Sequence, residues 1–136
     1  LWNTLPNVWL NGQWERVERG AVSLFSGDWA TVSELLSSER AALSLAAEGY
    51  DLILTADSIY STDAAPRLYQ LIVDQLRRPS GVALVAAKSY YFGVGGSVAQ
   101  FRDLVERGGL LEHRGALTIE DGSSNRREVL ELRWKT

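Results

Sequence analysis

The sequence predicts an α/β fold, in which strands and helices alternate along one chain. Short apolar segments of strand length recur between longer segments whose apolar residues have helical spacing. Residues 82–87 form an apolar segment without polar alternation, which is typical of a strand in a parallel sheet covered by helices on both faces. Residues 126–134 alternate apolar and charged residues, as a half-buried antiparallel strand does. We therefore expect a mostly parallel sheet that ends in an antiparallel hairpin.

The composition is that of a soluble globular domain. The chain has 136 residues, of which 46% are hydrophobic and 23% are charged, enough for one domain with its own core. The longest apolar runs have the length of strands, so we expect no membrane partner. A net charge of −3 argues against direct nucleic-acid binding through bulk positive charge. With no cysteine and only His113 as histidine, thiol chemistry is excluded and no metal site is expected.

We expect residues 1–136 to belong to a single domain. No repeat, low-complexity segment or linker divides the chain. The chain has no methionine and begins at Leu1, so we expect it to be a piece of something longer or a processed product. The sequence shows no signal peptide, which fits a cytoplasmic or nuclear location.

The N-terminal part of the chain is predicted to contain the tail of a helix, two strands and a long helix. Leu1–Leu5 is predicted as the helix tail, which Pro6 would end because proline disfavours helical geometry in the preceding residue. Residues 21–25 and 50–55 are rich in β-branched and aromatic residues, which predicts two strands. Residues 30–48 repeat apolar positions at helical spacing.

The C-terminal part is predicted to contain two further helices and three strands. One helix follows Thr62 or Asp63 as its N-cap. The other begins after Ser97, also an N-cap residue, and ends at Gly108-Gly109, since glycine accepts the left-handed geometry that follows a helix. Strands are expected at 82–87, 110–120 and 126–134.

Three strand-to-loop junctions should lie at one edge of the sheet, because ligands of open α/β sheets bind beyond the carboxyl ends of the strands. In Asp28-Trp29, the aspartate caps a helix, or the pair forms an adenine site. In Asp57–Tyr60, the aspartate serves a turn and the tyrosine packs, or the two residues direct a carboxylate and a phenol at a reacting group. Residues 93–96 form a flexible glycine turn or a phosphate-binding loop.

Taken together, four segments resemble the eukaryotic histidine protein methyltransferases. These segments are Thr4–Val8, Phe25–Trp29, Tyr50–Thr55 and Lys88–Gly96. The family consists of seven-strand methyltransferases that use S-adenosylmethionine and modify a histidine of a large-subunit ribosomal protein. Asp57-Ser58-Ile59-Tyr60 is also similar to the Asp-x-x-Tyr signature of related protein lysine methyltransferases.

The resemblance implies a Rossmann-like class I methyltransferase fold that is incomplete, with its first two strands absent. Residues 1–136 would be the C-terminal part of the catalytic domain. The glycine-rich cofactor loop and the acidic residue that holds the ribose would precede Leu1. The missing strands would lie between the 21–25 strand and the 50–55 strand.

The resemblance also implies a role for each candidate site residue. The residues implied to bind S-adenosylmethionine are Ser26, Gly27, Asp28, Trp29 and Ala56. The residues implied to be catalytic are Asp57 and Tyr60, and those implied to face a protein substrate are Tyr90, Tyr91 and Gly93. The expected activity is histidine N-methylation, with these 136 residues alone inactive. The alternatives are lysine methylation and a non-catalytic interaction module derived from the same fold.

Overall fold

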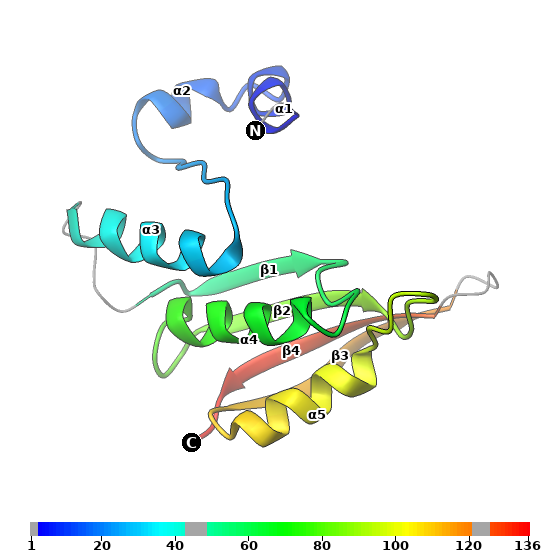
Figure 1. The fold of residues 1–136 in the computed structure, drawn as a ribbon. Helices are drawn as coiled ribbons and strands as arrows, with labels where there is room; N and C mark the ends of the chain where they lie inside the picture. Colours follow the sequence, from blue (N-terminus) through cyan, green and yellow to red (C-terminus); the bar gives the residue numbers. More distant parts are fainter. Residues whose placement is uncertain (1–2, 43–48, 121–125) are drawn as a thin grey trace.

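A computed structural model describes residues 3–42, 49–120 and 126–136. Helices and strands alternate from the third helix to the third strand, and a fourth strand follows (Figure 1). The elements in order are α1 (Thr4–Leu10), α2 (Trp14–Glu18), α3 (Trp29–Ala42), β1 (Leu52–Ala56), α4 (Ala64–Gln75), β2 (Val82–Lys88), α5 (Val98–Gly108), β3 (Leu111–Ile119) and β4 (Arg127–Trp134). The predicted α/β class is confirmed.

The strands form one mixed sheet in the order β1-β2-β4-β3. Strands β1 and β2 are parallel, with Leu54 opposite Leu84. Strand β4 pairs antiparallel with both β2 and β3, so the expectation of a mostly parallel sheet is wrong for the described residues. The two C-terminal strands are antiparallel neighbours, as predicted, and the link at 121–125 lies outside the described residues.

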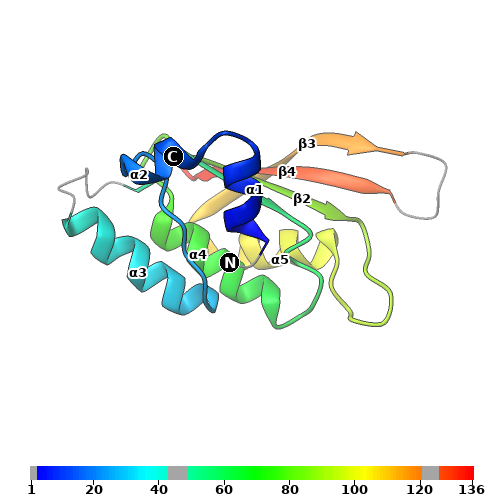
Figure 2. The same cartoon turned by 90° about the horizontal axis from the view of Figure 1, so that it is seen from above.

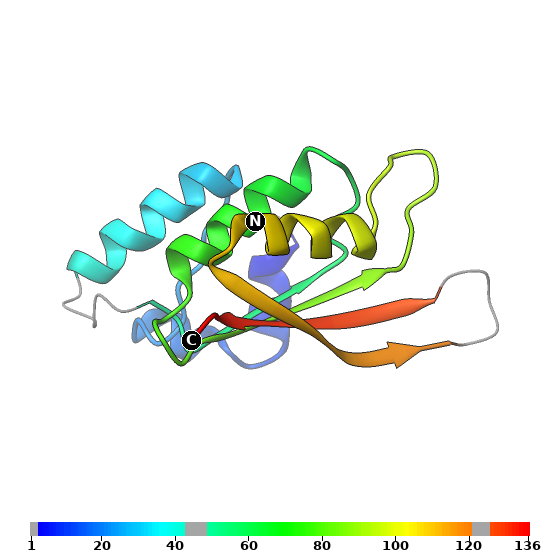
Figure 3. The same ribbon diagram turned by 90° about the horizontal axis from the view of Figure 1, so that it is seen from below.

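The core lies between the sheet and a layer of helices on one of its faces. Helices α4 and α5 cover this face, and α3 packs beside α4 (Figures 2 and 3). Both covering helices lie close to the positions that the sequence predicts, and their apolar residues Leu68, Ile72 and Phe101 are buried. The largest fully buried side chains include Phe101, Ile72, Val105, Leu130 and Leu132.

The opposite face of the sheet is largely open. Along β2, buried residues alternate with half-buried ones, which corrects the prediction that residues 82–87 are covered on both faces. On β1, Leu52 is 53% exposed and Leu54 is 68% exposed. Helices α1 and α2 lie beyond the β1 edge of the sheet and bury no residue of their own (Figure 1). The apolar content of β1 and β2 therefore exceeds what the described helices cover.

The N-terminal predictions differ from the structure in two places. Helix α1 runs through Pro6, which lies in its first turn, where the missing N–H of proline leaves no bond unmade. Residues 21–25 do not form a strand. A strand needs a neighbour to pair its backbone, and no described strand pairs with the outer edge of β1. Instead, the N–H groups of Ala21 and Val22 donate to the Arg16 carbonyl.

The helix ends follow local chemistry, with one correction. The Ser97 hydroxyl accepts from the Gln100 N–H at 3.2 Å, and Gly109 ends α5 in the left-handed conformation, both as predicted. Neither Thr62 nor Asp63 caps α4 with its side chain. Asp63 occupies the N-cap position, but the Ser61 hydroxyl accepts from the Ala64 N–H at 3.2 Å.

The long helix and the first strand of the sheet lie close to their predicted positions. The predicted helix at 30–48 appears as α3, and residues 43–48 lie outside the described part. The predicted strand at 50–55 appears as β1, which begins two residues later and ends one residue later. In the part of the chain that the structure describes, no helix is long and apolar enough to cross a bilayer.

Candidate active site

Two loops meet beyond the carboxyl ends of β1 and β2. Because these strands are parallel neighbours, the loops that follow them leave the same edge of the sheet. Residues 57–61 follow β1, and residues 89–97 follow β2. The Gly96 N–H donates to the Tyr60 carbonyl at 3.1 Å, and the Gly96 carbonyl accepts from the Tyr91 N–H at 3.0 Å. The two loops are therefore joined, and they bring two of the predicted junctions together.

The Asp57 carboxylate lies at this edge with a buried phenol behind it. The Tyr91 hydroxyl donates to Asp57 Oδ1 at 2.6 Å and accepts from the Lys88 backbone N–H at 3.1 Å. Asp57 is exposed, whereas Tyr91 is only 9% exposed and belongs to the core. Of the two residues, only Asp57 has an accessible functional group. The sequence predicts that Tyr91 faces the substrate, but its side chain packs beneath Asp57.

The main chain at Asp57 adopts an unusual conformation. Its φ of 52° lies in the left-handed region, and among the described residues it is the one non-glycine with positive φ. The Asp57 N–H donates to the Ala86 carbonyl at 2.9 Å, which ties the turn to β2. Such a conformation costs about 1–3 kcal/mol and persists only where surrounding contacts fix it. Strained residues of this kind concentrate at functional sites, so the geometry favours a role for Asp57.

The Tyr91 phenol stays protonated far above neutral pH. Burial, together with the hydrogen bond to Asp57, raises the pKa of Tyr91 to about 12, and the Lys88 N–H partly opposes this rise. A protonated phenol donates a hydrogen bond. Tyr91 is therefore a fixed donor toward Asp57 over the whole physiological range of pH.

A pocket of about 250 Å³ lies where the beginnings of α3 and α4 approach each other. Its lining residues are Gly27, Asp28, Trp29, Tyr60, Ser61, Ala64 and Arg67. The structure thus brings three of the predicted cofactor residues together with the predicted catalytic Tyr60. Trp29 also packs against the core, so one aromatic side chain serves both the pocket wall and the helix layer.

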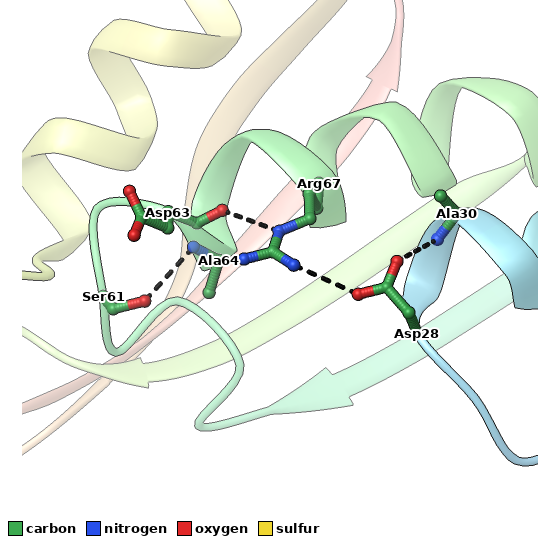
Figure 4. A network of polar contacts seen from close by, with 6 residues as sticks. All are labelled: Asp28, Ala30, Ser61, Asp63, Ala64 and Arg67. Carbon is green, nitrogen blue, oxygen red and sulfur yellow. Dashed lines mark hydrogen bonds and ion pairs between the residues drawn. The ribbon is translucent and has the colours of Figure 1, made fainter.

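Asp28 has two partners within this group (Figure 4). Its Oδ1 accepts from the Ala30 N–H at 3.0 Å, which confirms the predicted N-cap of α3. Its Oδ2 pairs with Arg67 Nη1 at 3.1 Å, and Arg67 Nε donates to the Asp63 carbonyl at 3.1 Å. The Asp28 side chain remains 53% exposed. A carboxylate has about four acceptor positions, so Asp28 retains capacity for a further donor.

Arg67 is a candidate site residue that the sequence analysis missed. It lies in the first turn of α4 and reaches across to Asp28 at the start of α3 (Figure 4). No local pattern identifies this pairing, because the two residues are separated by 39 positions. Only the packing of α3 against α4 places them together.

Exposed aromatic side chains surround the joined loops. Tyr60 and Tyr90 are each 49% exposed, and Phe92 is 73% exposed. Tyr90 and Phe92 pack edge to face with ring centroids 4.9 Å apart. Neighbouring aromatic side chains that remain this exposed are a feature of surfaces that a partner covers. Tyr90 is thus positioned as the sequence analysis expects of a substrate-facing residue, a role that stays a prediction.

The other predicted residues lie at the periphery. Ser26 and Ala56 are exposed but do not line the 250 Å³ pocket, and Gly93 is an exposed loop residue with φ of 79°. Their predicted cofactor and substrate contacts stay predictions. His113 belongs to the edge strand β3, where its Nε2 lies 3.1 Å from Glu106 of α5.

The arrangement defines the class of protein to which the chain can belong. A mixed α/β sheet with accessible groups at the carboxyl ends of its parallel strands is compatible with a methyltransferase-like fold. No protein-family model matches the chain. Curated proteins do match it.

The chain is 36% identical over 129 residues to a histidine protein methyltransferase 1 homolog of Dictyostelium discoideum, an alignment that covers 95% of this chain and 37% of that protein. A rat protein of the same name is 38% identical over 112 residues, which cover 82% of this chain and 29% of the rat protein. A bovine one is 34% identical over 97% of this chain and 39% of its own length. The chain belongs to the histidine protein methyltransferase family and spans less than two fifths of the length of these relatives.

Proposed function

We propose that the natural protein carrying these 136 residues methylates a histidine side chain of another protein, with S-adenosylmethionine as the methyl donor. The observation that supports this most is the Asp57 carboxylate, which is accessible, held by Tyr91 and placed at the carboxyl end of β1. Family membership supports the same activity, since the relatives are named as histidine protein methyltransferases.

A carboxylate at this position suits a histidine target. Free histidine has a pKa near ~6.5, so the target is mostly neutral in the cell and one ring nitrogen already carries a lone pair. Asp57 would accept a hydrogen bond from the N–H of the ring, which fixes the tautomer and orients the other nitrogen. Methylation leaves a positive charge on the ring, and a nearby carboxylate stabilises that charge. A strong base is not required before the reaction.

The pocket beside Trp29 has the chemistry to hold the adenine end of the cofactor. It combines an aromatic side chain with the partly exposed Asp28 carboxylate, and the two suit a flat ring and its amino group. At about 250 Å³ it is smaller than most sites for whole ligands, so it fits one end of the molecule. When bound, S-adenosylmethionine supplies an electrophilic methyl group. In this proposal, Arg67 keeps Asp28 in place rather than touching the cofactor.

The proposed partner is a protein segment that presents a histidine to the joined loops. Tyr90 and Phe92 are positioned to cover that segment and exclude water, which strengthens the interaction between Asp57 and the ring. On the basis of the family resemblance, we propose that the substrate is a ribosomal protein of the large subunit. The reaction would take place in the cytoplasm or the nucleus.

The first prediction pairs two variants of the natural protein that carries these residues. Asp57→Asn should lower kcat by about a hundredfold, because the charge that stabilises the methylated ring is lost, and it should leave cofactor affinity nearly unchanged. Trp29→Ala should give the opposite pattern and weaken cofactor binding by about tenfold. Methylation of purified ribosomal proteins with mass spectrometry measures the first effect, and calorimetric titration measures the second.

The same experiment distinguishes the alternative functions. Mass spectrometry identifies the modified side chain, so methyl-lysine in place of methyl-histidine would replace the proposed activity with lysine methylation. A free lysine has a pKa near ~10.4 and needs to lose a proton before it reacts, which assigns Asp57 a different task. A protein that binds ribosomal proteins without modifying any residue would be an interaction module.

A further inference from the structure

The hydroxyl of Tyr91 lies behind the Asp57 carboxylate, between the ends of two neighbouring strands. Its ring is buried among core residues, and its oxygen connects the end of β2 with the turn after β1. It accepts one hydrogen bond from Lys88 N–H at 3.1 Å and donates one to Asp57 Oδ1 at 2.6 Å. The phenol is therefore aimed at a single carboxylate oxygen from inside the protein, and the solvent side of Asp57 is left accessible.

Asp57 is thus fixed from two directions. Its main chain, with φ of 52°, is tied to β2 through the bond from its N–H to the Ala86 carbonyl at 2.9 Å. Its side chain is tied to the 89–97 loop through Tyr91. That loop is in turn fastened to the segment after Asp57, because Gly96 bonds both Tyr60 and Tyr91 through its backbone. A carboxylate held in this way has little freedom to rotate.

We propose that Tyr91 is a positioning residue, which holds the Asp57 carboxylate so that its second oxygen faces the target ring. This inference rests on the proposed function, in which Asp57 accepts a hydrogen bond from the substrate histidine. It gives Tyr91 a role that acts through Asp57, in place of direct contact with the substrate. The hydrogen bond also spreads part of the carboxylate charge into the protein, so the oxygen that remains free has a defined direction.

Tyr69 provides a matched control for this role. It is 8% exposed, close to the 9% of Tyr91, and both rings pack in the same core. Among the described residues its hydroxyl has no hydrogen-bond partner. Replacing either tyrosine by phenylalanine removes one oxygen and keeps the ring. The two changes therefore match in size and burial. They differ in the two hydrogen bonds of the Tyr91 hydroxyl, to Asp57 and from the Lys88 N–H, and the Asp57→Asn background isolates the first of these.

The test uses Tyr91→Phe, Asp57→Asn and the double variant in the natural protein that carries these residues. Tyr91→Phe should lower kcat for histidine methylation by about tenfold, since a small misplacement of a catalytic group is costly, with KM for the protein substrate and Kd for S-adenosylmethionine changed by less than about twofold. In the Asp57→Asn background the same change should alter kcat by less than about twofold, because groups that act as a unit are not additive. Tyr69→Phe should leave kcat within about twofold of the unmodified protein.

Several results would overturn the inference. If the kcat of Tyr91→Phe equals that of Tyr69→Phe, or if its effect multiplies in full with that of Asp57→Asn, Tyr91 does not act through Asp57. If Tyr91→Phe fails to fold, Tyr91 is replaced with a fluorinated tyrosine, which keeps the ring and lowers the pKa of the phenol. Its kcat should then fall at a lower pH than the kcat of the unmodified protein, because the phenol loses the proton that it donates to Asp57. A folded fluorinated variant whose profile of kcat against pH matches that of the unmodified protein would also contradict the role. Absence of histidine methylation in the unmodified protein would instead contradict the proposed function, so the two failures are distinguishable.

Discussion

The proton on Tyr91 links the chemistry of one side chain to the stability of the fold. Burial and the bond to Asp57 favour the neutral phenol, because a phenolate there would be poorly solvated and would face a carboxylate at 2.6 Å. An unfolded chain exposes the same phenol to water, where its pKa is near ~10. The folded protein therefore holds this proton more tightly than the unfolded chain does.

This difference predicts a loss of stability at alkaline pH. The pKa of Tyr91 is raised to about 12 in the folded protein, so below about pH 10 both states keep the proton and the contribution of Tyr91 is fully present. Between those values only the folded state keeps it, and the free energy of unfolding falls as pH rises. Urea denaturation at about pH 9 and about pH 11.5 should show a smaller fall for Tyr91→Phe than for the unmodified chain. Equal falls would show that Tyr91 is not protected from ionisation.

At the scale of the elements, the joined loops depend on the lack of a side chain at Gly96. A Cβ atom built there would lie 2.2 Å from the Ile59 carbonyl oxygen and 2.4 Å from the Tyr60 carbonyl carbon. Both neighbours are backbone atoms, so neither can rotate away as a flexible side chain would. The close approach allows Gly96 to bond Tyr60 and thereby to fix the segment that follows Asp57.

Gly96→Ala should therefore lower the free energy of unfolding by about 1–3 kcal/mol, the usual cost of overpacking. Gly27→Ala is the matched control. A Cβ at Gly27 would meet Val32 Cγ2 at 3.5 Å, an ordinary contact, and Gly27 is not among the glycines with positive φ. Urea denaturation midpoints should show a clear shift for Gly96→Ala and almost none for Gly27→Ala. Equal urea midpoints for the two variants would mean that the close contact between the two loops does not contribute to the free energy of unfolding.

What the sequence predicts about these elements depends on how local the signal is. The apolar spacing of Val98, Phe101 and Val105 identifies α5, and Ser97 and Gly109 mark its ends, because helix formation and capping involve neighbouring residues. Residues 21–25 carry a strand pattern but form no strand, since a strand depends on a partner elsewhere in the fold.

The same limit applies to the candidate site. Two of the three junctions lie where the sequence predicts them, because loops after parallel strands collect at one edge of an α/β sheet. The segment before Asp28 forms no strand, so packing of α3 against α4 brings the third junction to this edge. The bond between Asp57 and Tyr91 spans 34 positions, and the pair of Asp28 and Arg67 spans 39, so no sequence spacing reveals either of them. Residue types at the junctions could be predicted, whereas the partners of each carboxylate follow from packing alone.

The whole molecule is asymmetric, because its sheet has one covered face and one open face. The open face is apolar toward β1, where Leu52 and Leu54 are exposed, and charged toward β3 and β4, where Arg114 pairs with Glu131 at 2.8 Å. No described strand pairs with the outer edge of β1, so its backbone groups on that side are available to another strand. An exposed apolar edge of this kind promotes pairing between chains.

We therefore expect the 136-residue chain to associate with itself, through the apolar part of the open face and the outer edge of β1. Leu54→Lys places a charge on the most exposed leucine of β1 and should shift the population toward monomer, since a lysine at a strand edge opposes pairing. Glu112→Gln is the matched control, because each change makes the net charge of −3 less negative by one unit, and Glu112 is an exposed residue of β3, at the other edge of the sheet. Sedimentation velocity over a range of concentrations should show association of the unmodified chain and of Glu112→Gln, and a largely monomeric Leu54→Lys. Equal association of both variants would place the contact elsewhere on the molecule. A monomeric unmodified chain would show that the chain does not associate with itself.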